Sequence, residues 1–263
     1  MLAMLIVVLS LLAITASAAS ASILAGYGQS VRWSGWIDQG KGLHFNRVSA
    51  TWRVPTVSCP PLGGASYSLT WIGLGGSNEN KLEQIGTETD CSGHFGASPS
   101  TSYSALWWEV LPSPQQYPVQ EVSPGDLVQA SVAVKGKIAT MWLKDLTQGW
   151  TFVKRTKPRE LTEDSADWIE EDPEICPGTV IFVSCPEKPF AHYRTVTFTH
   201  AKTTDTAGFT GSISDPHWYA FRYGMIQGNG LQRLLSWPSP LRDGGTSFSV
   251  SRTNRKPPPE PSV

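Results

Sequence analysis

The sequence predicts an all-β fold on the strength of three observations. Apolar and polar residues alternate with a period of two in many short segments, as they do in half-buried strands. Turn-forming sequences, such as Ser123–Asp126 and Leu241–Gly245, separate these segments. Gly and Pro account for 24 and 20 of the 263 residues and only 16% of residues are charged, which argues against helical repeats and disorder. We therefore expect a two-sheet antiparallel β-sandwich.

The expected strands follow one another along most of the chain. In the clearest case, Val128, Ala130, Val132 and Val134 point to one face of the strand. The best helix candidate is Glu160–Glu171, but its apolar residues form no single stripe, so the sandwich is favoured. The expected strands are Val48–Val54, Tyr67–Leu74, Asp126–Val134, Ile138–Leu143, Tyr193–His200, Trp218–Ile226 and Thr246–Val250.

The two ends of the chain differ from the rest. An apolar run, Leu2–Ile14, is short for a membrane span and precedes the small residues Ala16–Ala18, a pattern typical of a cleaved signal peptide. We expect a signal peptide over residues 1–18 and export into the extracellular space. Because no Lys or Arg precedes the run, an uncleaved anchor is the alternative. One domain is expected over residues 27–254, with a disordered Pro-rich tail over residues 255–263.

Composition and motifs exclude several classes of function. A formal net charge of -1 gives no reason to expect nucleic acid or an anionic membrane as a partner. The sequence contains no GxSxG, HExxH or P-loop motif, and its five histidines lack ligand-like spacing. Export favours disulfide bonds, and no zinc motif occurs among the four cysteines, Cys59, Cys91, Cys176 and Cys185. Hydrolysis would therefore have to use carboxyl and amide groups.

Three segments place such groups beside large apolar side chains. Gln84 lies in a strand-like run, Glu109 follows two tryptophans, and Glu171 follows Trp168 and Ile169. Spacing alone favours structural roles: a half-exposed strand residue for Gln84, a buried ion pair for Glu109 and a solvated loop acid for Glu171. The apolar neighbours of Glu171 nevertheless indicate a half-buried carboxyl group, and desolvating such a group is costly.

Five motifs, in this order, resemble those of the glutamic peptidase family, the eqolisins. They are WIGLGG (residues 71–76), LEQIGTETDC (82–91), LWWEVLP (106–112), SPGD (123–126) and SADWIEED (165–172). Similarity runs from Ser34–Pro55 to Thr195–Ala201. The resemblance implies a secreted, acid-active endopeptidase on a lectin- or glucanase-like jelly roll. It also implies polypeptide substrates and no metal or cofactor, and we expect a monomer.

The same resemblance assigns roles to individual residues. Gln84 and Glu171 would be the catalytic pair, and Asp167 takes the place of the family's first acid. An ionised Glu171 can accept a proton from water, while Gln84 offers an uncharged donor to the oxyanion. The residues that match the family's substrate cleft are Trp36, Trp71, Trp107 and Glu109.

Three positions depart from the family's pattern. Gly75 and Ala105 stand where an acid is expected, and Leu111 replaces a cleft tyrosine. Because acids are missing, we expect an optimum below neutrality that is milder than in strongly acid-adapted relatives.

The cysteines are expected to form two bridges, Cys59–Cys91 and Cys176–Cys185. Each pair flanks a candidate active-site segment, and its two members are near in sequence. The second bridge would close a short loop directly after Glu171.

Two other functions are compatible with the same residues. The tryptophans could stack on sugars while Glu109 and Glu171 form a two-carboxylate glycosidase site. Gln84 discriminates between the glycosidase and peptidase hypotheses, because a glycosidase does not need this residue whereas the peptidase does. A catalytically inactive binding module of the same fold is the third reading, since two expected acids are absent.

Overall fold

The computed structural model describes residues 26–40, 42–77, 81–93, 101–173, 189–227 and 233–253. These residues form strands and one short 3-10 helix, Asp243–Gly245, with no α-helix among them, which confirms the all-β prediction. The strands are β1 (Gly26–Ser30), β2 (Trp33–Gln39), β3 (Phe45–Arg53), β4 (Leu69–Gly75), β5 (Leu82–Ser92), β6 (Thr101–Val110), β7 (Leu127–Lys135), β8 (Ile138–Asp145), β9 (Thr151–Thr156), β10 (Ser165–Glu171), β11 (Thr195–Asp205), β12 (Thr210–Gly211), β13 (Tyr219–Ile226), β14 (Leu234–Pro238) and β15 (Phe248–Arg252).

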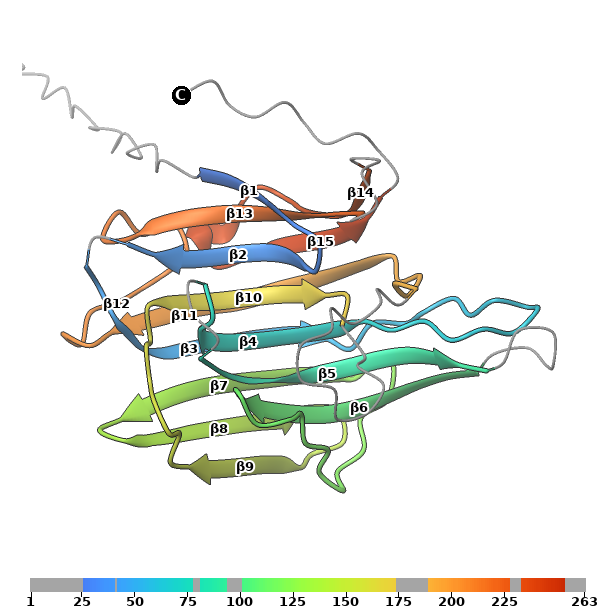
Figure 1. The fold of residues 1–263 in the computed structure, drawn as a ribbon, viewed down its shortest axis with the longest axis horizontal. Helices are drawn as coiled ribbons and strands as arrows, with labels where there is room; N and C mark the ends of the chain where they lie inside the picture. Colours follow the sequence, from blue (N-terminus) through green and yellow to red (C-terminus); the bar gives the residue numbers. More distant parts are fainter. Residues whose placement is uncertain are drawn as a thin grey trace, which may run out of the picture.

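The strands form two layers joined by β11 (Figure 1). One layer, here called the site sheet, has the order β6-β5-β4-β10-β2-β13-β14-β15. The other, the back sheet, has the order β11-β3-β7-β8-β9. Residues 195–198 of β11 pair with β15, and from Thr199 onward the strand pairs with β3, with a register shift between Thr199 and Lys202. One strand departs from the antiparallel prediction, because β1 pairs with β13 in parallel.

Two apolar clusters cover the two faces of the site sheet. The inner cluster lies between the sheets and contains Trp36, Ile72, Trp168 and the expected Val128–Val134 face of β7. The outer cluster lies on the opposite face of the site sheet and contains Ile37, Leu69, Trp71, Leu82, Trp107 and Ile169. Because side chains alternate along a strand, each central strand contributes to both clusters. This explains why β4 is buried along its whole length.

The segment that carries Glu171 is a strand, not a helix. Residues 165–171 pair antiparallel with β4 on one side and with β2 on the other. Trp168 packs in the inner cluster and Ile169 in the outer one. Both apolar residues are therefore buried, although they point in opposite directions. A helix would have placed these adjacent residues on neighbouring positions of one surface.

The expected Cys59–Cys91 disulfide is present, with a Cα–Cα distance of 5.5 Å. It ties the segment after β3 to the far end of β5, the strand that carries Gln84. The expected Cys176–Cys185 bridge, the signal peptide and the Pro-rich tail lie outside the described residues. Within the described part of the chain, no helix is long and apolar enough to cross a membrane.

We predict that replacing both Cys59 and Cys91 with alanine lowers the free energy of unfolding by about 3–4 kcal/mol, because the bond closes a loop of 32 residues in sequence. Urea unfolding of the double variant and the wild type measures this difference. Equal unfolding midpoints for the two proteins would show that the bond does not constrain the unfolded chain.

Candidate active site

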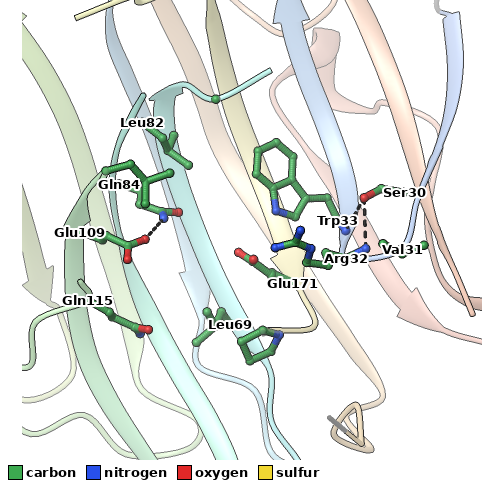
Figure 2. A pocket seen from close by; sticks show the side chains of 13 residues that line it. Ser30, Val31, Arg32, Trp33, Leu69, Leu82, Gln84, Glu109, Gln115 and Glu171 are labelled. Carbon is green, nitrogen blue, oxygen red and sulfur yellow. Dashed lines mark hydrogen bonds between the residues drawn. The ribbon is translucent and has the colours of Figure 1, made fainter. Parts of the chain in front are cut away.

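A cavity of about 490 Å³ opens on the outer face of the site sheet (Figure 2). Its floor comes from β4, β5, β6 and β10, and its walls come from the β1–β2 turn and the segment after β6. The lining residues are Ser30, Val31, Arg32, Trp33, Leu69, Gly76, Leu82, Gln84, Glu109, Leu111, Gln115, Glu171 and Pro173. The cavity therefore brings together all three polar groups that the sequence analysis selected.

The strand register explains this convergence. Gln84 lies opposite Glu109 of β6 and opposite Gly73 of β4. Glu171 lies opposite Leu69 of β4 and opposite Trp33 of β2. Gln84 and Glu171 are thus separated by β4, and both side chains reach the outer face from their own strands.

Two glycines allow the floor to pack closely. A Cβ atom on Gly73 would lie 2.7 Å from Leu82 Cδ1 and 3.0 Å from the Trp71 ring. A Cβ atom on Gly86 of β5 would overlap the Thr70 carbonyl and lie 2.6 Å from Trp71 Cβ. A larger residue at Gly73 would crowd Leu82 and the Trp71 indole, and one at Gly86 would push against the β4 backbone at Thr70 and Trp71.

A hydrogen bond orients the Gln84 amide. Its Nε2 donates to Glu109 Oε2 over 2.6 Å, and the Gln84 side chain is 5% exposed. Burial raises the pKa of Glu109, whereas the hydrogen bonds from Gln84 and from the Gln115 backbone lower it. Since Gln84 Nε2 carries two hydrogens, one remains for a second acceptor in the cavity.

Glu171 is half-buried and is held by two indoles. Trp71 Nε1 donates to Glu171 Oε2 over 2.7 Å, and Trp33 donates a second hydrogen bond. Burial raises the pKa of Glu171 to about 7, the two indole donors and Arg32 lower it, and Glu109 raises it. A carboxyl group with such a pKa can exchange its proton near neutral pH, as a general base must.

The adjacent acid, Glu170, faces the other way. It is fully buried between the sheets, where Thr70 Oγ1 donates to its Oε2 over 2.6 Å. Burial raises the pKa of Glu170 well above its usual range, so this group is a neutral acid and an internal structural residue. Of the two adjacent glutamates, only Glu171 reaches the cavity.

The three expected tryptophans lie on two different faces of the site sheet. Trp71 and Trp107 are fully buried and lie in the outer cluster beneath the cavity. Trp36 lies on the opposite face of β2, in the inner cluster, where its Nε1 donates to Ser239 O over 3.2 Å. The expectation that Trp36 lines the cleft is therefore wrong, because its position in the strand points it inward.

Trp33 lines the cavity instead, and sequence reasoning missed it. Its ring meets the Trp71 ring edge-on at 5.2 Å. Alternation along β2 could have identified Trp33, because Trp33, Gly35 and Ile37 share one face of the strand. Arg32 and Gln115 were also missed, since both lie outside regular strands and no period marks them.

Asp167 shares the outer face with Glu171 but does not reach the cavity. It is fully buried, and Ser165 Oγ donates to its Oδ2 over 3.3 Å. Burial raises its pKa well above the usual range. In the described ranges, no three His, Cys, Asp or Glu side chains are grouped as a metal ion would require.

Two further acidic side chains, Glu88 and Asp90, are buried farther along β5. Tyr103 donates to Asp90 over 2.8 Å and Tyr117 donates to Glu88 over 2.5 Å. Burial, together with the neighbouring Glu88, raises the pKa of Asp90 to about 9. Elsewhere on the strand, burial and Glu163 raise the pKa of Glu83 to about 8. The site sheet therefore holds several carboxyl groups that keep their protons at neutral pH.

Comparison with family models and curated proteins gives one match. The model of the peptidase A4 family matches residues 31–226. This range contains every described residue that lines the cavity except Ser30. A search of curated proteins found no relative.

Solved structures of glutamic peptidases share the fold. Scytalido-glutamic peptidase, solved with a peptide-based transition-state analogue, is 25% identical, with a TM-score of 0.67 over 85% of this chain and 99% of that chain. SCP-B, an eqolisin solved with the tripeptide Ala-Ile-His, is 25% identical, with a TM-score of 0.65 over the same shares. Aspergilloglutamic peptidase from Aspergillus niger, at 23% identity and a TM-score of 0.56 over 72% and 99% of the two chains, supports the fold alone.

The buried carboxyl groups predict a fold that is most stable in acid. Because the folded-state pKa values of Glu83 and Asp90 are raised to about 8 and about 9, their contribution is fully present below the unfolded pKa values near 4 and is lost as the pH rises through 8 and 9. We expect the free energy of unfolding to fall by at least ~2 kcal/mol between about pH 5 and pH 9.

Urea unfolding at the two pH values measures this difference. The Glu83→Gln variant is the matched control, since it keeps the size of the protonated side chain and cannot ionise. It should lose less stability at high pH than the wild type does. Equal stability of the wild type at the two pH values would contradict the raised pKa values.

Proposed function

The chain belongs to the peptidase A4 family, and from this premise we propose that Gln84 and Glu171 are the catalytic pair with which it hydrolyses peptide bonds. One observation carries the proposal: the two groups reach one cavity from strands on either side of β4, and each is held by its own partner, Glu109 or Trp71. Because fixed groups need little reorganisation during the reaction, such an arrangement suits catalysis.

The proposed reaction has two steps. The Glu171 carboxylate accepts a proton from a water molecule, whose oxygen attacks the carbonyl carbon of the peptide. The free hydrogen of Gln84 Nε2 donates to the oxyanion of the tetrahedral intermediate. Glu171 then transfers its proton to the amine nitrogen, the C–N bond breaks, and the carboxyl and amine products leave.

The protein is an endopeptidase and acts on peptides, in keeping with its family and with the peptide ligands of its structural relatives. We further propose that it is exported and works as a monomer, without nucleic acid or membrane partners. The apolar run near the N-terminus and the Cys59–Cys91 bond support export. We do not propose the sugar-cleaving alternative, because it gives the Gln84–Glu109 hydrogen bond no role.

Substitutions separate the proposed roles. Glu171→Gln cannot accept a proton, so we expect kcat/KM to fall by roughly 10³-fold or more. Gln84→Ala removes the oxyanion donor, so we expect a loss of roughly 10²–10³-fold, mostly in kcat. The double variant should be scarcely worse than Glu171→Gln, because both groups serve one transition state. Hydrolysis of a quenched fluorescent peptide measures each rate.

Two further variants serve as controls. Glu170→Gln changes the adjacent acid in the same way, but it faces the interior and is already neutral, so the rate should stay within a few-fold of wild type. Glu109→Gln should lose activity only in part, because Gln84 keeps an acceptor. Circular dichroism checks that every variant is folded. A folded Glu171→Gln variant with near wild-type activity would show that Glu171 is not the base.

The pKa of Glu171 predicts the acid side of the pH–rate profile. Because the base acts only when ionised, kcat/KM should fall tenfold per pH unit below the pKa of about 7. Half of the full rate is then reached near pH 7, which places the optimum at or slightly above neutrality, higher than the sequence analysis expects. The profile of kcat/KM between about pH 3 and pH 9 tests the prediction, and full activity at about pH 5 would contradict it.

A further inference from the structure

Arg32 lies in the turn between β1 and β2, and its backbone is fixed against the end of β10. Ser30 Oγ accepts hydrogen bonds from the backbone N–H groups of Arg32, over 3.1 Å, and Trp33, over 3.0 Å. The Arg32 carbonyl accepts a hydrogen bond from the Asp172 N–H over 2.9 Å. The residue after Glu171 is thus hydrogen-bonded to Arg32, which anchors the turn to the end of β10.

The Arg32 guanidinium extends over the cavity toward Glu171 (Figure 2). Other elements around Glu171 offer mostly uncharged groups: Trp71 and Leu69 from β4 and Trp33 from β2. Glu109 of β6 lines the same cavity and is an acid. On β10 itself Glu170 faces the opposite side of the sheet. Among the described cavity residues, Arg32 is the one cationic side chain.

We propose that Arg32 is a positioning residue that stabilises the ionised form of Glu171 and so sets the lower pH limit of the activity. The inference rests on the proposed role of Glu171 as the general base. Its physical reason is that a nearby positive charge favours a carboxylate over a neutral carboxyl group. Because Arg32 is exposed, water and salt screen this attraction, and the effect is moderate.

The charges around Glu171 act in opposite directions. Burial is the largest influence and raises the pKa of Glu171, Glu109 raises it further, and Arg32 lowers it. Removing Arg32 should therefore move the acid limb of the rate profile to higher pH. Removing the charge of Glu109 should move the limb to lower pH.

The experiment compares the pH profiles of kcat/KM for four proteins with a quenched fluorescent peptide that contains no acidic residue. Arg32→Gln should shift the acid limb upward by roughly 0.5–1 pH unit, a three- to tenfold lower rate at about pH 5 and a loss that becomes smaller as the pH rises. Arg32→Lys should keep the acid limb close to that of the wild type, because it keeps the positive charge. Arg47→Gln, which removes an exposed charge from β3 in the back sheet, should leave the profile unchanged, and Glu109→Gln should shift the limb downward.

A direct titration separates this inference from the proposed function. The carboxyl-carbon NMR resonance of Glu171, assigned by its loss in Glu171→Gln, is followed against pH in the Gln84→Ala background with and without Arg32→Gln. A higher midpoint without Arg32 supports the inference. The inference is overturned if Arg32→Gln leaves the acid limb and the titration midpoint in place. It is also overturned if Arg32→Gln lowers the rate equally at all pH values. If Glu171→Gln retains activity, the proposed function itself is wrong.

Discussion

The candidate site depends on the register of β10 between β4 and β2. Because side chains alternate along a strand, this register sends Glu171 to the cavity and Glu170 into the interior. A slip by one residue would exchange the two acids. Trp168 opposes such a slip, since its indole fills the inner cluster and donates to Ser49 O over 3.0 Å, a hydrogen bond that Ile169 could not make. The large apolar pair beside the acids is therefore what makes one of those acids usable.

Burial acts on all acids of the site sheet, but their partners differ. The hydroxyls of Thr70 and Ser68 donate to Glu170, and that of Ser165 donates to Asp167, but desolvation outweighs these hydrogen bonds and both acids keep their protons. Glu171 has two indole donors and a neighbouring guanidinium, which offset part of the desolvation cost. The same physical effect thus gives neutral structural acids in the interior and one acid at the cavity that titrates near pH 7. The expected stability in acid and the proposed role of Glu171 as a base follow from a common cause.

Much of this arrangement was predictable from sequence. Period-two alternation predicts the strands, and the motifs around Gln84, Glu109 and Glu171 predict three groups that the structure places in one cavity. The Cys59–Cys91 bond was also predicted correctly. Trp36 was assigned to the wrong face because a motif match carries no information on which way a strand residue points. The parallel pairing of β1 with β13 and the approach of Arg32 to Glu171 depend on contacts between distant segments, which no local pattern encodes.

The floor and walls of the cavity have different origins. The floor is made of paired strands that pack closely at Gly73 and Gly86, so a larger residue at either position would disturb the strands between Gln84 and Glu171. Much of the wall comes from the β1–β2 turn and the segment after β6, which contribute Val31, Leu111 and Gln115. Natural variation or a directed-evolution library could therefore change substrate preference through the walls while the reaction chemistry stays constant. Under the proposed function, wall positions other than Arg32 can change specificity without changing the reaction.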